Sequence, residues 1–192
     1  MAPLSRDQEV LVVTVSIMAS LMAICGDVIL IYAIRKRWAK GDKTYYRILL
    51  FLSAIDMLNA FWYASSTVLM PVEYTSRHLA VGNVASCAAS GFFISFGTAI
   101  YSYNAMLSLF FFLKIRYGMK KRPMARLEIY LHAAALMAAL APAMLGLVLE
   151  TYNEMDVGLG CWNAGLPNSP EGCGDTCIRG SQARLVGYVT AV

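Results

Sequence analysis

Charged residues are scarce in this chain. Lys, Arg, Asp and Glu make up 15% of its 192 residues, whereas hydrophobic residues make up 58%. So few polar side chains cannot cover the surface of a water-exposed globule, and so many hydrophobic ones exclude a disordered chain. The five cysteines do not make the chain a disulfide-knotted mini-protein. The composition is typical of an integral membrane protein.

Four long segments contain almost no charge. Each exceeds the roughly 20 apolar residues needed to cross a bilayer, which forces each to be helical because backbone amides find no water there. The predicted spans cover approximately residues 10–34, 48–72, 84–113 and 129–149, and a further apolar segment starts near residue 185. We therefore predict an all-α, polytopic transmembrane helical bundle that forms a single transmembrane domain over residues 1–192.

The apolar segment at the end of the sequence is too short to cross a membrane. Only eight residues follow Arg184, which is about 12 Å of helix. The simplest interpretation is an N-terminal fragment of a longer protein, with four complete spans plus the start of a fifth. A complete four-span protein with a short apolar tail is the alternative.

Lysine and arginine are concentrated in two short connections. Residues 35–47 and 114–126 hold twelve of the sixteen. Such basic connections stay in the cytoplasm, which places the N-terminus and residues 150–184 outside the cell. We expect a multi-pass protein of the plasma membrane with membrane lipids, and no nucleic acid, as partners.

Cysteine placement agrees with this topology. Cys87, Cys161, Cys173 and Cys177 all fall on the predicted outer side, where oxidation is allowed. Four cysteines permit three pairings. We favour Cys87 with Cys161 and Cys173 with Cys177, while the alternative is that some of these thiols stay free.

Three polar residues lie at a similar depth inside the predicted spans. Asp27, Asp56 and Asn104 are eight to ten residues from the basic residue that ends each span on the inner side, or about 12 to 15 Å. Carboxyl groups inside a membrane are costly and are usually functional. We predict an intramembrane polar cluster of these three residues, acting either as a switch that shares a proton or cation, or as a static clasp.

Several short motifs resemble those of G-protein-coupled receptors. Gly26–Leu30 is similar to the Gly-Asn-x-x-Val of the first helix in the rhodopsin class, with Asp in place of Asn, and Leu52–Asp56 to the Leu-x-x-x-Asp of its second helix. Cys87 and Cys161 resemble the disulfide shared across most of the superfamily. The pair Cys161 and Trp162 resembles the Cys-Trp of the secretin-like and cyclic-AMP-receptor-like branches, which makes a divergent receptor near these branches the best fit.

The resemblance implies signal transduction from an extracellular ligand to a heterotrimeric G protein, with a second receptor as a dimer partner. Because activation in the family depends on movement of the sixth helix, a truncated chain that ends in the fifth is not expected to signal alone. The Asp-Arg-Tyr of the rhodopsin class is missing at its expected place near Phe110–Leu113. Residues proposed to contact a cytoplasmic partner are Lys114, Arg116 and Tyr117. Candidates for ligand binding, each also explained by helix packing, are Trp62, Tyr63, Thr67, Ser90, Phe93, Thr98, Tyr101 and Trp162.

No enzyme motif is present in the sequence. The two histidines fall on opposite sides of the predicted membrane, and no glycine-rich phosphate loop or nucleophile with a matched base is found. We therefore expect no catalytic residue, metal site or cofactor. Two other classes remain as alternatives to a receptor: a four-span adhesion or scaffold protein, and an ion or proton translocator.

Overall fold

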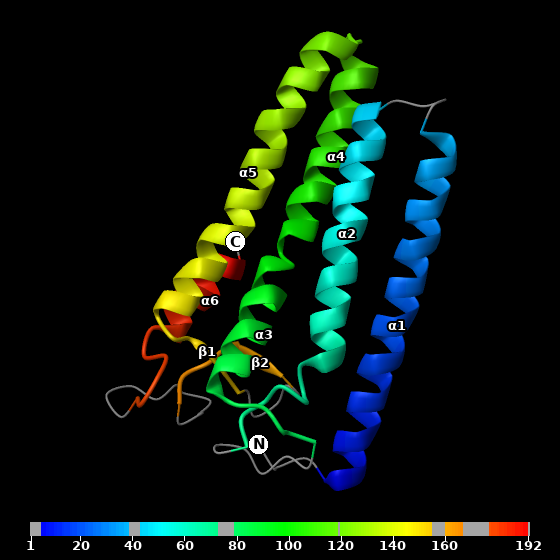
Figure 1. Cartoon of the computed structure of the whole chain (residues 1–192). Coiled ribbons are helices and arrows are strands. Elements are labelled where there is room, and N and C mark those ends of the chain that lie inside the picture. Colours follow the sequence, from blue (N-terminus) through cyan, green and yellow to red (C-terminus); the bar gives the residue numbers. More distant parts are fainter. Residues whose placement is uncertain are drawn as a thin grey trace.

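A computed structural model describes residues 5–38, 43–72, 79–118, 120–154, 160–166 and 177–191. The helices are α1 (Arg6–Arg37), α2 (Lys43–Ser65), α3 (Val84–Phe96), α4 (Ala99–Arg116), α5 (Lys121–Val148) and α6 (Ala183–Ala191), and the strands are β1 (Tyr152–Glu154) and β2 (Cys161–Asn163). The long helices run up and down side by side (Figure 1). Helix α2 packs on α1, α3 and α4, and α3 and α4 both pack on α5.

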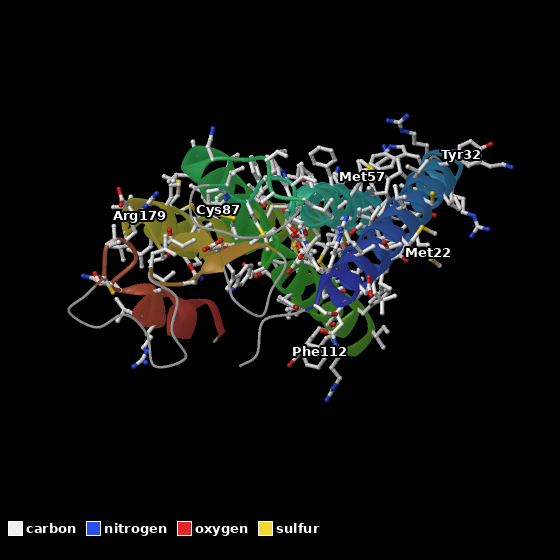
Figure 2. All side chains as sticks on the ribbon, turned by 90° about the horizontal axis from the view of Figure 1, so that it is seen from below. Met22, Tyr32, Met57, Cys87, Phe112 and Arg179 are labelled. Atoms are coloured by element: carbon white, nitrogen blue, oxygen red, sulfur yellow. A yellow bond between two sulfur atoms is a disulfide. The ribbon has the colours of Figure 1, made fainter. Side chains whose placement is uncertain are left out.

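Four helical segments are long and apolar enough to cross a membrane. They are Arg6–Arg37, Lys43–Ser65, Val84–Arg116 and Pro123–Val148. The structure therefore contains the four helices that the prediction of a multi-pass membrane protein requires. Large apolar side chains such as Met22 and Tyr32 are 72% and 67% exposed on the outside of the bundle, where a membrane would cover them (Figure 2).

The bundle has two chemically different ends. We call the end formed by the last turns of α1 and α4 and the first turns of α2 and α5 the basic end. The opposite end, with the start of α3, the end of α5 and the two strands, is called the disulfide end; the strands lie at the bottom of Figure 1. The N-terminal start of α1 lies at the disulfide end, so the first and third spans end at the basic end, and the second and fourth spans end at the disulfide end.

The second span is shorter than predicted. We expected it to reach Val72, but α2 ends at Ser65. The hydroxyl of Ser66 donates to the carbonyl of Tyr63 at 2.9 Å, and the chain then turns so that Pro71 pairs with Gly82 in a short bridge. Side-chain hydroxyls that bond to nearby carbonyls compete with helix continuation, which explains the earlier end.

The third span is interrupted in its middle. Between α3 and α4, the amides of Thr98, Ile100 and Tyr101 donate to carbonyls three residues earlier. A turn of this 3₁₀ type has 3.0 residues per turn instead of 3.6. The overwinding rotates the following helix, so that α4 buries Ala99, Tyr103, Met106 and Phe110.

The all-α prediction is incomplete. The loop after α5 forms a two-stranded antiparallel sheet in which β1 pairs with β2, with Asn153 opposite Trp162. A further bridge joins Leu166 to Arg179 and leads into α6. The predicted outer loop is therefore a folded layer over one end of the bundle. Helix α5 continues through Pro142.

Candidate functional site

A buried carboxylate joins two helices at the basic end. The Glu128 side chain on α5 is only 4% exposed. Arg47 on α2 donates to both of its oxygens, from Nε to Oε1 and from Nη2 to Oε2 at 2.6 Å, and the Thr44 hydroxyl donates to Oε2 at 2.8 Å. Paired hydrogen bonds between a guanidinium and a carboxylate are strong and directional. Glu128 therefore fixes α5 against the first turns of α2.

His132 extends this network to α4. Its Nε2 lies 3.7 Å from Oε1 of Glu128, one helical turn earlier, and its Nδ1 is 3.0 Å from the hydroxyl of Tyr103. The ring of Phe51 packs on the imidazole with centroids 4.7 Å apart. Three helices thus meet around one acid and one base. We call Thr44, Arg47, Tyr103, Glu128 and His132 the basic-end network.

Two intramembrane aspartates lie side by side between α1 and α2. The buried side chain of Asp27 interacts with Ser53 and Asp56 on α2. Oδ2 of Asp27 and the Ser53 hydroxyl are fully buried with no hydrogen-bond partner among the residues described. Asp27 and Asp56 therefore influence each other electrostatically, and their role as a switch or a static clasp stays a prediction. Polar contacts of this kind hold membrane helices together.

Asn104 does not join the two aspartates. It is exposed on α4, and its side-chain amide donates to the carbonyl of Ile100 on its own helix at 2.9 Å. The prediction treated the third span as one continuous helix. Because the turn at Gly97 and Thr98 rotates α4, Asn104 faces outward together with Tyr101, which is 77% exposed.

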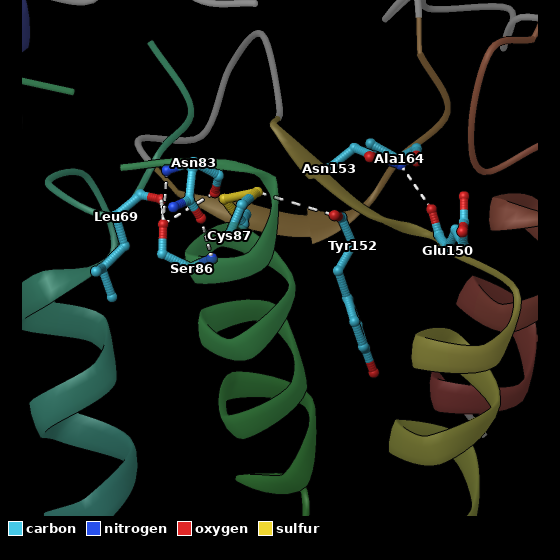
Figure 3. The surroundings of a disulfide bond; sticks show 9 residues. Leu69, Asn83, Ser86, Cys87, Glu150, Tyr152, Asn153 and Ala164 are labelled. Atoms are coloured by element: carbon cyan, nitrogen blue, oxygen red, sulfur yellow. Dashed lines mark hydrogen bonds between the residues drawn. A yellow bond between two sulfur atoms is a disulfide. The ribbon is translucent and has the colours of Figure 1, made fainter. Parts of the chain in front are cut away.

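The disulfide end is tied to the third span by a covalent bond. Cys87 at the start of α3 is bonded to Cys161 on β2, as we favoured, and both are 1% exposed (Figure 3). Cys177 is also disulfide-bonded, whereas Cys173 lies outside the described residues. Asn83 caps α3 and exchanges hydrogen bonds with Ser86, whose hydroxyl reaches the carbonyl of Leu69 at 2.9 Å. The bond therefore links β2 to a well-anchored helix start.

Tyr152 inserts from β1 between α3 and α5. Its side chain extends down into the bundle beside α3 (Figure 3), and its hydroxyl donates to the carbonyl of Ala143 at 2.9 Å. Burial raises the pKa of its phenol, so the group stays protonated and able to donate. Glycines face both sides of the ring: a Cβ on Gly91 would lie 2.7 Å from the ring and one on Gly146 2.6 Å from the hydroxyl oxygen. Only glycine leaves room for this side chain.

A methyl group on Gly91 tests the fit of Tyr152. We expect Gly91→Ala to destabilise the protein by about 1 to 3 kcal/mol, because the ring is held on both sides and cannot move away. Gly26→Ala is the matched control, since Gly26 is also helical and has no atom within 4 Å of its Cβ position. Thermal unfolding in detergent measures both. Equal effects of the two substitutions, or an unchanged cost of Gly91→Ala in a Tyr152→Leu background, would show that the Tyr152 ring is not what excludes a side chain at position 91.

The predicted ligand-binding residues fall into two groups. Trp62 and Phe93 stack across α2 and α3, with ring centroids 4.5 Å apart and planes 8° apart. The side chains of Thr67 and Ser90 are also buried, and that of Trp162 is partly buried. Tyr63 is 47% exposed on the outside of the bundle, as Tyr101 is, and the hydroxyl of Thr98 donates to the carbonyl of Ser95 at 2.8 Å. Ligand binding by any of them stays a prediction.

The predicted contacts for a cytoplasmic partner lie at the end of α4. Lys114 stands over the ring of Phe110 at 5.2 Å, and the guanidinium of Arg116 lies 5.9 Å from the ring of Tyr117. All three predicted residues are exposed. They are therefore accessible at the basic end.

Sequence reasoning missed most of the basic-end network. Glu128 was assigned to the connection outside the fourth span, and Arg47 was counted only as a basic loop residue. The signal was a lone acid at the border of a basic segment, four residues before the only histidine in that span. Residues four apart lie on one helix face, so this pair marked the face of α5 that meets its neighbours.

The chain matches no protein-family model, no curated protein and no solved structure. Its function is therefore inferred from the residues and their geometry.

Proposed function

We propose that this chain acts as a G-protein-coupled receptor-like membrane protein, which carries an extracellular ligand signal to a heterotrimeric G protein. The observation that carries the proposal is the Cys87–Cys161 bond. It fastens the loop after the fourth span across the start of the third, beside the stacked rings of Trp62 and Phe93. A ligand at this end would contact the loop and the helices at once.

The basic end contains the contacts that would change when a ligand binds at the disulfide end. The basic-end network links α2, α4 and α5, and α2 also packs against α3, which carries the disulfide. A ligand shifts a protein between two packings only if it binds one of them more tightly. A change in the spacing of α2 and α3 at the disulfide end would alter the contacts of Arg47 and Tyr103. Lys114, Arg116 and Tyr117 are exposed at the same end of the bundle and would meet the G protein.

Capture of G-protein subunits tests the proposal. The chain, with an N-terminal epitope tag, is expressed with each class of Gα subunit. We expect the tag to stain intact cells and at least one class to be recovered with the protein from detergent extracts. Recovery should fall about tenfold or more in Lys114→Glu/Arg116→Glu, because charge reversal in a charged contact is strongly unfavourable.

The control keeps the same change of charge at the same end. Lys36→Glu/Arg37→Glu alters exposed residues of α1 that lie outside the proposed contact, so recovery should be retained. Staining confined to permeabilised cells, or recovery of no Gα subunit, would contradict the proposal. Surface display without any Gα would favour an adhesion or scaffold protein, and proton or ion flux in liposomes would favour a translocator.

A further inference from the structure

Among the residues that the structure describes, the exposed charge at the basic end has a single sign. Among the residues described there, the exposed cationic side chains are Arg35, Lys36, Arg37, Lys43, Lys114, Arg116, Lys120 and Arg126. The only carboxylate described at this end, Glu128, is buried against Arg47. Its negative charge is therefore compensated inside the bundle and does not offset the surface cations.

Helix ends add to this positive potential. Helices α2 and α5 both begin at the basic end, and neither has an acidic residue in its first turn. The first turn of a helix carries partial positive charge on its free amides, which acidic residues usually offset. The disulfide end differs, because exposed Asp7 and Glu150 accompany its cations and Glu150 pairs with Arg179 at 3.2 Å.

The cations lie at the height where lipid headgroups would lie. Each follows or precedes an apolar span directly, and exposed apolar residues adjoin them, with Ile115 80% and Ile129 69% exposed. Trp38, after the last turn of α1, stacks on Tyr46 of α2 with centroids 6.2 Å apart. Tryptophan and tyrosine prefer the boundary between headgroups and hydrocarbon. The positive side chains thus lie at the ends of α1, α2, α4 and α5, all at one end of the bundle.

We propose that the basic end binds phospholipids with negatively charged headgroups and gathers them as a shell around the bundle. Arg35, Lys36 and Arg37 are consecutive on a helix, so their side chains fan out over about 200° and reach several lipids instead of one. Clusters of cations directly beside a membrane span attract anionic lipids in this way. The location of this lipid in the cytoplasmic leaflet rests on the orientation assumed for the proposed function; the binding does not.

Lipid selection by the purified full chain tests this inference. The protein is reconstituted in nanodiscs of phosphatidylcholine and phosphatidylserine, and native mass spectrometry counts the lipids that remain bound. We expect phosphatidylserine to be enriched over its share in the disc, and this enrichment to fall as salt is raised. In Arg35→Gln/Lys36→Gln/Arg37→Gln the enrichment should fall roughly fivefold.

The control neutralises two exposed cations at the disulfide end, Arg6→Gln/Arg184→Gln, and should keep the enrichment. Equal retention of the two lipids by the unmodified protein, or no loss in the α1 triple variant, would overturn the inference. Displacement of phosphatidylserine by an acidic peptide at lower concentration than by soluble phosphoserine would point to a protein partner instead. None of these results depends on recovery of a Gα subunit, so the two proposals fail separately.

Discussion

Replacing Arg47 by methionine is expected to lower the unfolding free energy of the detergent-solubilised protein by about 3 to 5 kcal/mol. The reason is the position of its partner: the Glu128 side chain is 4% exposed and, among the residues described, would keep Thr44 and His132 as polar neighbours. A carboxylate that is buried without its main counter-charge is costly. Thermal and chemical unfolding, followed by helical circular dichroism, measures the loss.

Removing the acidic partner, Glu128, should lower the unfolding free energy by less than removing Arg47. The Arg47 side chain is 39% exposed, so in Glu128→Leu it can turn its guanidinium toward headgroups or water; we expect about 1 to 2 kcal/mol. The double variant Arg47→Met/Glu128→Leu should be more stable than Arg47→Met alone, because no unpaired charge stays buried. Arg126→Met, an exposed cation on the same helix, serves as control. Equal and additive single effects would contradict the coupling.

Loss of the Cys87–Cys161 bond is expected to lower stability by about 2 to 4 kcal/mol. The bond closes a loop of 74 residues in sequence, and long loops lose more entropy on closure than short ones. The spans within this loop stay helical even when tertiary packing is lost, so the loop loses less entropy on closure than a fully unfolded one. We therefore expect an effect within the range typical of disulfides. The measurement compares the unfolding of Cys87→Ser/Cys161→Ser with that of the unmodified protein.

Cys25→Ser supplies the matched control, since Cys25 is a free, exposed cysteine on α1. A reducing agent should destabilise the unmodified protein and Cys25→Ser alike. It should have a smaller effect on the Cys87→Ser/Cys161→Ser variant, in which the bond to Cys177 still responds. A stability of the double variant equal to that of the unmodified protein would show that the loop after α5 holds its place without the bond, through contacts such as that of Tyr152 with Ala143.

The Cys87–Cys161 disulfide was predictable because it depends only on the directions of two neighbouring spans. Cys87 opens a span and Cys161 follows the next one, so the direction of two helices is enough to bring both to the same end. Tyr152 illustrates the opposite case. Its insertion requires glycines at two positions on different helices, Gly91 and Gly146, and nothing local to any of the three residues indicates that they meet.

The sequence by itself determined the four spans and the concentration of cations in two connections. Both follow from composition over windows of about 20 residues, because the bilayer leaves helices as the only way across. It also brought Asp27 and Asp56 to one depth, since depth is a count of residues along a helix of fixed rise.

Only the tertiary structure decided which faces of the helices meet. The turn at Gly97 and Thr98 rotates α4, so Tyr103 enters the bundle while Asn104 leaves it. Successive residues are rotated by roughly 100° about a helix axis. A short overwound turn therefore rotates all the side chains of the following helix together, without changing the spacing of its apolar residues in the sequence. The pairing of Glu128 with Arg47 depends on the rotations of two helices at once, which is why neither residue alone revealed it.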